Sequence, residues 1–171
     1  MAGPTCSIFV PEAKQAVVKQ IIDKAVKDLA TEVVDREFWI QSTEAIGGAC
    51  NASENRPFSI HDQRLQLEYS TEEVLRLKKA IGFNPEIEVT VVAYCNRKID
   101  RKILAEITLY LAIELDGAIN FGGLLNLKGE AVVGKLWRIP YESDEKGSTY
   151  HVSDPNFLKF WIQCDAFTMI K

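Results

Sequence analysis

The side chains that could do chemistry are few, and the two histidines show where to look for them. His61 precedes Asp62, and His151 lies three residues before another aspartate. A histidine oriented by a carboxylate can serve as the base for a cysteine nucleophile, and Cys50 and Cys95 are candidates for that role. The spacing does not require such a pair. A surface or interface role for His61 and a structural role for His151 are the simpler interpretations.

Metal and phosphate sites have no recognisable motif in this sequence. There is no HExxH, no HxH and no CxxC, which are common spacings of metal ligands. The glycine pairs Gly47-Gly48 and Gly122-Gly123 do not form GxGxxG, and no GxxxxGK[ST] occurs. We therefore expect no cofactor, no metal ion and no catalytic residue.

Composition and charge favour a cytoplasmic protein that binds neither nucleic acid nor membrane. The 171 residues are 47% hydrophobic and 26% charged, which predicts a single globular domain over residues 1–171. The net charge is −4, and the basic residues are divided between two predicted helices instead of forming one stripe. No signal peptide and no apolar run near the length of a membrane helix is evident. The four cysteines lack paired spacing, as is usual in a reducing compartment.

Hydrophobic periodicity predicts four helices and a larger number of short strands. Ser70 and Glu73 form a capping box before one of the helices, and Asp154-Pro155 is an N-cap and first-turn pair before another. The expected helices cover residues 12–31, 71–81 and 99–115 and a segment after residue 155. The expected strands are residues 6–10, 33–41, 57–70, 86–94, 118–121, 131–139, 150–152 and 167–170. Residues 45–56 and 140–149 are expected to be loops, and the tail 167–171 to be packed.

This order of elements predicts an α+β fold with a mixed or antiparallel sheet and helices packed mainly on one face. Its first half resembles a split βαβ, ferredoxin-like arrangement. Strand phase then assigns Phe38, Leu65 and Val89 with their alternating neighbours to the covered face. The opposite phase gathers carboxylates around one tryptophan, and these residues are the predicted partner-binding site: Asp35, Glu37, Trp39, Glu68, Glu86 and Glu88. The alternative is a solvated sheet face on which a loop half covers Trp39.

Three stretches of the chain resemble a bacterial family of uncharacterised domains. They are the opening Met-Ala-Gly-Pro, the block from Cys95-Asn96 to Asp116-Gly117-Ala118-Ile119-Asn120-Phe121-Gly122-Gly123-Leu124, and an ending that runs from His151-Val152 through Trp161 to Met169 and Lys171. Small acidic proteins of this kind often look like immunity proteins encoded beside secreted toxins. The stretch around residues 47–55 does not match the family's pattern.

These observations lead to a hypothesis and two alternatives. The hypothesis is a cytoplasmic immunity protein that binds a cognate, basic bacterial toxin and neutralises it by occlusion. The first alternative is a regulatory or scaffold module that binds another protein. The second is a small hydrolase-type enzyme that uses His61 or His151.

Overall fold

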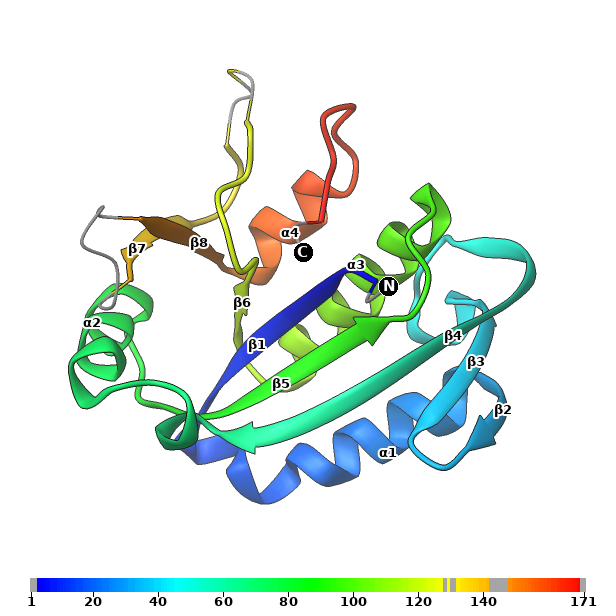
Figure 1. Ribbon diagram of the computed structural model, residues 1–171, viewed down its shortest axis with the longest axis horizontal. Coiled ribbons are helices and arrows are strands. Elements are labelled where there is room, and N and C mark those ends of the chain that lie inside the picture. The colour runs from blue at the N-terminus through cyan, green and yellow to red at the C-terminus, as the bar shows by residue number, and fades with distance from the viewer. Residues whose placement is uncertain (1–2, 128, 130–131, 142–147, 170–171) are drawn as a thin grey trace.

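The computed structural model describes residues 3–127, 129, 132–141 and 148–169 (Figure 1). The described residues form one eight-stranded sheet in the order β2-β3-β4-β5-β1-β6-β8-β7, and every strand pair in it is antiparallel. The strands are β1 Thr5–Pro11, β2 Ala30–Val34, β3 Glu37–Ser42, β4 Asn51–Arg64, β5 Pro85–Ala93, β6 Ala118–Asn120, β7 Leu136–Pro140 and β8 Thr149–Ser153. The helices are α1 Val18–Leu29, α2 Thr71–Ile81, α3 Lys98–Glu114 and α4 Pro155–Trp161, with short 3-10 helices η1 Glu12–Val17, η2 Glu44–Ile46 and η3 Leu65–Leu67. The expected α+β class with an antiparallel sheet is confirmed.

The ferredoxin-like arrangement expected for the first half is not formed. A split βαβ unit places its two strands parallel to each other in one sheet. Here β1 pairs antiparallel with β5 on one side and with β6 on the other. The helix α1 therefore leads away from β1 to the edge of the sheet, where β2 lies.

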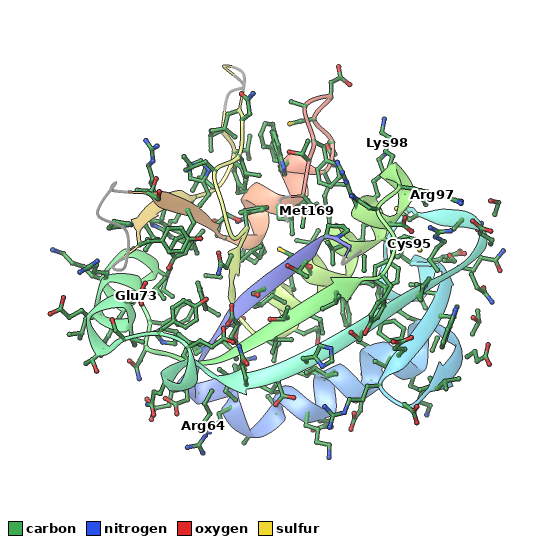
Figure 2. The ribbon with its side chains drawn as sticks, viewed as in Figure 1. Arg64, Glu73, Cys95, Arg97, Lys98 and Met169 are labelled. Atoms are coloured by element: carbon green, nitrogen blue, oxygen red, sulfur yellow. The ribbon has the colours of Figure 1, made fainter. Side chains whose placement is uncertain are left out.

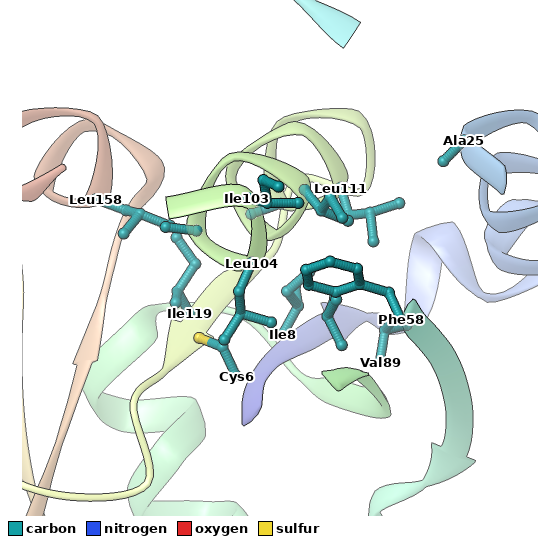
Figure 3. Close-up of a cluster of buried hydrophobic side chains, with 14 of the residues drawn as sticks. Cys6, Ile8, Ala25, Phe58, Val89, Ile103, Leu104, Leu111, Ile119 and Leu158 are labelled. Atoms are coloured by element: carbon teal, nitrogen blue, oxygen red, sulfur yellow. The ribbon is translucent and has the colours of Figure 1, made fainter. Parts of the chain in front are cut away.

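Three helices cover one face of the sheet and enclose the larger core. Alternate residues of β1 and β5, among them Ile8 and Val89, are fully buried beneath α3, where Leu104 and Leu111 meet them (Figure 3). The helices α1 and α4 contribute to the same cluster, so the expected one-sided helix layer is confirmed for three of the four helices. None of the helices in the described residues has the length and apolarity needed to cross a bilayer.

The fourth helix, α2, packs on the opposite face of the sheet. Its Leu77 is fully buried against Phe9 of β1, which points away from the larger core. The β7–β8 hairpin completes this second cluster with Ile139 and Tyr150. The helix begins and ends as the sequence predicts, with a capping box at Ser70 and a left-handed Gly82 (φ 85°).

The predicted strand over residues 33–41 is a hairpin of two strands. β2 ends at Val34, the turn places Asp35 at φ 55°, and β3 begins at Glu37. An aspartate tolerates this left-handed conformation better than most residues, but no Asn-Gly or Asp-Gly pair signals the turn. The valines Val33 and Val34 are 55% and 47% exposed on the edge strand, so their apolar character did not indicate burial.

The second half of the predicted loop over residues 45–56 is the beginning of β4, which starts at Asn51. The connection before it is held on α3, because the Glu106 carboxylate accepts hydrogen bonds from the Thr43 hydroxyl and from the backbone N–H groups of Ala49 and Cys50. Gly48 lies so close to this contact that a Cβ there would stand 2.5 Å from the Glu106 carboxylate. The glycine-rich stretch is thus a tight support for β4 and not an open loop.

A buried ion pair holds the same end of β4 against α3. Arg56, 5% exposed, donates from Nε and Nη2 to the two carboxylate oxygens of Asp100 at 2.6 and 3.0 Å. Asp100 also accepts from the Arg97 backbone N–H at 2.7 Å, which caps the first turn of α3. A bidentate pair whose carboxylate accepts a further hydrogen bond is a geometry in which a buried ion pair is tolerated.

The predicted strand over residues 57–70 ends at Arg64, and Leu65–Leu67 is a 3-10 helix. Strand alternation therefore does not extend to Glu68 and Tyr69. In the last third of the chain, β7 begins at Leu136 and is shorter than the strand expected over residues 131–139. Residue 131 of that strand lies outside the described residues, as do residues 142–147 of the expected loop.

The tail is packed but forms no strand up to residue 169, and residue 170 lies outside the described residues. Met169 is 4% exposed, the Phe167 ring lies 6.4 Å from that of Trp161, and the Trp161 indole N–H donates to the Thr168 carbonyl at 3.0 Å. The expected packing of the tail is thus present up to residue 169.

Candidate binding face of the sheet

The sheet face that carries α2 is covered over only part of its length. The segments α2, η3 and β7–β8 close the end around Phe9, whereas no helix of the described residues lies over this face of β3, β4 and the adjoining parts of β5 and β1 (Figure 1). We call the first part the closed half and the second part the open half. Strand register places on the open half Glu37 and Trp39 of β3, Ser59, His61 and Gln63 of β4, Thr90 and Val92 of β5, and Thr5 and Ser7 of β1.

A polar cluster at the centre of the open half presents one histidine and one tyrosine. The Ser59 hydroxyl lies 2.8 Å from His61 Nε2 and 3.2 Å from the Tyr94 hydroxyl. Ser59 itself is 0% exposed, whereas Tyr94 is 40% exposed. The serine therefore positions the two rings on the surface, and in this conformation its own oxygen is not accessible to attack a substrate.

The same part of the sheet is polar between strands β1 and β5 as well. Ser7 and Thr90 are directly opposite each other, and their hydroxyl oxygens lie 2.9 Å apart. Together with Val92 and Trp39 these side chains make a surface of hydroxyls and aromatic rings with little net charge. Such a composition is common in protein-binding sites, where tyrosine and tryptophan supply contact area and hydroxyls supply hydrogen bonds.

Among the described residues, His61 is hydrogen-bonded to Ser59 and His151 to the Leu125 N–H, and neither is hydrogen-bonded to Cys50 or Cys95. The Cys50 thiol lies against Glu106 and Thr43, and burial followed by the Glu106 carboxylate raises the pKa of Cys50 to about 12. Burial likewise raises the pKa of Cys6 to about 12, so both thiols are protonated at neutral pH. His61, by contrast, contacts Ser59 on the other face of the sheet.

His151 has a structural position. Its Nδ1 accepts a hydrogen bond from the Leu125 backbone N–H at 3.0 Å, which fixes the neutral form of the ring. Burial and the nearby Arg138 charge lower the pKa of His151, in the direction expected for a histidine kept neutral. Asp154 does not orient it, because that carboxylate accepts from the backbone N–H groups of Phe157 and Lys135 as the cap of α4.

The structure separates the six residues predicted to bind a partner. Glu37 and Trp39 are neighbours on the open half, and Asp35 lies beside them in the β2–β3 turn. Glu86 and Glu88 lie at the start of β5, and Glu68 follows η3. Register places Glu37 opposite Ser59 but Glu88 opposite Gln63, four residues or about 13 Å further along β4. The predicted acidic ring around Trp39 is therefore reduced to Asp35 and Glu37.

Glu88 is buried and contributes to the closed half. It is 3% exposed and accepts hydrogen bonds from Gln63 Nε2 at 3.2 Å and from the Tyr69 hydroxyl at 3.1 Å. Burial and the Glu88 charge raise the pKa of Tyr69, so the phenol remains a donor to the carboxylate. Strand phase gave the correct face for Glu88, and the structure buries its carboxylate against Gln63 and Tyr69, so it is not presented on the surface.

Several cations lie away from the open half, whereas Arg36 lies beside Asp35 in the β2–β3 turn. Figure 2 shows Arg64 at the last residue of β4 and Arg97 and Lys98 at the opposite end of the sheet, all pointing outward from the molecule. Within the described residues, no three His, Cys, Asp or Glu side chains gather as metal ligands. Tyr94 and Val92 are among the members of the open half that the sequence analysis did not select. Their place at the end of β5, in phase with Thr90, is the signal that could have found them.

The architecture is that of an α+β protein with an antiparallel sheet and one partly uncovered face. The chain belongs to a family of unknown function, DUF6368, which matches residues 2–171. The expected membership of an uncharacterised domain family is thereby confirmed. Comparison with curated proteins found no significant match, and comparison with solved structures found none either.

Proposed function

We propose that this chain is a protein-binding module whose partner docks on the open half of the sheet. The observation that supports this most is the contrast within one face: α2 and β7–β8 cover the closed half, while the open half presents Trp39, Tyr94 and His61 without a covering element of the described chain. Partly exposed aromatic side chains in a polar surround are typical anchors of protein interfaces.

The finer proposal is an immunity protein that neutralises a cognate bacterial toxin by occlusion. The net charge of −4 favours it. The resemblance of the sequence to a bacterial family of uncharacterised domains also favours it, because small acidic proteins of this kind often look like immunity proteins. The carboxylates of Asp35 and Glu37 beside Trp39 would attract a basic partner and speed its encounter, while Trp39 would supply contact area.

Co-expression with the product of the neighbouring gene tests both levels of the proposal. An immunity protein should rescue growth from that product's toxicity and form a complex that survives purification. A complex without rescue would favour a regulatory or scaffold module. Absence of both complex and rescue would end the toxin proposal.

A Trp39→Ala variant tests where the partner docks. An anchor at the centre of an interface costs about 2 kcal/mol or more of binding free energy when it is truncated. Leu75→Ala is the matched control, because Leu75 is 59% exposed on α2 and lies outside the open half. Equal partner affinities of the two variants would place the interface elsewhere.

A further inference from the structure

The strand β4 extends beyond its neighbour β3 at one end. β3 begins at Glu37, opposite Ser59, whereas β4 continues to Arg64 while pairing with β5. Among the described residues, positions 60–64 of β4 therefore have a strand neighbour on one side only. Figure 1 shows this end of β4 running beside α1, with the β2–β3 hairpin further along the same edge.

The backbone of β4 presents hydrogen-bonding groups to this free edge. The Tyr94 N–H donates to the Pro57 carbonyl at 3.1 Å, so Pro57 directs its polar backbone atoms toward β5. Polar backbone groups alternate along a strand, which means that His61 and Gln63 also face β5. The N–H and C=O groups of Ile60 and Asp62 are thus directed at the free edge.

A groove of about 900 Å³ lies along this edge, between α1 and the β2–β3 turn. Its apolar lining includes Ile22 and Val26 of α1, Ile60 of β4 and Val33 of β2. A strand edge next to an apolar groove is the arrangement in which an extended peptide can add to a sheet, with main-chain hydrogen bonds on one side and side-chain pockets on the other.

The charges at the groove favour a cationic occupant. Four carboxylates line it, from Asp23, Asp35, Glu37 and Asp62, against three cations on α1 and in the β2–β3 turn. None of these four carboxylates forms an ion pair with another described residue. A second copy of this chain would bring the same net charge of −4, so like-charge repulsion disfavours it as the occupant.

We infer that the groove binds an extended, basic segment of the partner protein, which pairs antiparallel with residues 60–64 of β4 in line with β3. An apolar side chain of that segment would lie opposite Ile60 and a lysine or arginine opposite Asp62. This inference rests on the proposed function and adds the way in which the partner is held, since Glu37 borders both the groove and the open half.

Two variants at one position separate backbone pairing from charge. Asp62→Ala removes the carboxylate and keeps the N–H, whereas Asp62→Pro removes both. Proline is tolerated on a free strand edge because the lost N–H does not belong to the ladder with β5. Circular dichroism and the melting temperature serve to confirm that both variants fold.

The probe is a phage-displayed library of random nine-residue peptides, selected on the parent protein. We expect enrichment of peptides that alternate apolar and basic residues and lack proline. The enriched peptides should bind Asp62→Ala a few-fold more weakly and Asp62→Pro at least about tenfold more weakly, since only the latter loses a main-chain hydrogen bond. If Asp62→Pro does not fold, N-methylation of an enriched peptide replaces it. Two versions of the peptide are made, one methylated at the odd and one at the even backbone nitrogens, and the version whose methyl groups face β4 should lose binding to the parent by the same factor.

Three results would overturn the inference. They are no enrichment at all, equal binding of the enriched peptides to the parent and both variants, and a concentration-dependent dimer of the parent that Asp62→Pro abolishes.

The test also separates this inference from the proposed function. A co-expressed partner that binds Asp62→Pro and the parent equally would refute the groove and leave the protein-binding role intact. If the selected peptides require the Asp62 N–H but co-expression yields no partner protein, the groove would be supported and the proposed protein-binding role would not.

Discussion

The closed and open halves belong to the same face of the same sheet, yet they carry different kinds of side chain. In the closed half Phe9 and Leu77 meet with no exposed surface, and even the carboxylate of Glu88 is buried. In the open half the corresponding strand positions carry Ser7, Thr90 and His61. The comparison shows that the composition of each strand changes along its length where the covering element ends, so the uncovered part carries polar side chains that tolerate contact with water.

The largest expected effect concerns the apolar contact that closes one half. Leu77→Ala should lower the free energy of unfolding by about 2–5 kcal/mol, because a buried leucine leaves a cavity when truncated. Leu75→Ala on the same helix, where the side chain is 59% exposed, should cost far less. Urea denaturation of both variants measures the difference. Similar losses would mean that α2 does not close this half as described.

Two of the glutamates that the sequence predicted to bind a partner offer a second comparison. Glu88→Ala should cost about 1–3 kcal/mol of unfolding free energy, since it leaves the half-buried partners Tyr69 and Gln63 without their acceptor. Glu37→Ala on the open half should change stability by no more than about 0.5 kcal/mol. Urea denaturation of both variants measures the difference. If Glu37→Ala lowers the free energy of unfolding as much as Glu88→Ala does, the open half is a structural surface.

The pH dependence of stability should carry a contribution from His151, on the strand that completes the closed half. The folded state lowers the pKa of His151 below its ordinary value of 6.5, so the unfolded chain binds the proton more readily. Stability from this residue is therefore present above pH 6.5 and is lost as the pH falls through the lowered pKa. Melting temperatures between pH 7.5 and 5 should fall less steeply in His151→Asn than in the parent. An unchanged slope would contradict the assignment.

The smallest expected effect is kinetic and concerns the open half. Glu37→Lys should slow association with a basic partner several-fold at low ionic strength, and the difference should shrink in high salt as the charges are screened. Lys78→Glu on α2 is a suitable control, because it changes charge away from the open half. Stopped-flow association rates at two salt concentrations measure the effect. If Glu37→Lys and the parent associate at the same rate at both salt concentrations, electrostatic steering by Glu37 is refuted.

Local signals in the sequence predicted those features that depend on a few adjacent residues. The capping box at Ser70, the helix end at Gly82 and the N-cap at Asp154 all satisfy backbone groups within one turn, and each is found where it was expected. The inward face of β5, with Val89 toward the helices, was also predicted, because a strand has a fixed period of two.

The remaining features depend on contacts between distant residues. The stretch before Asn51 looked like a loop, since its contact with α3 depends on Glu106, an acceptor more than fifty residues away. Strand phase placed Glu88 on the correct face, but its burial depends on α2 and η3 packing above it. Only the tertiary structure shows that β4 extends beyond the start of β3 and that one half of the face is uncovered. A sequence period tells which way a side chain points, whereas only the packing of other elements tells what it meets there.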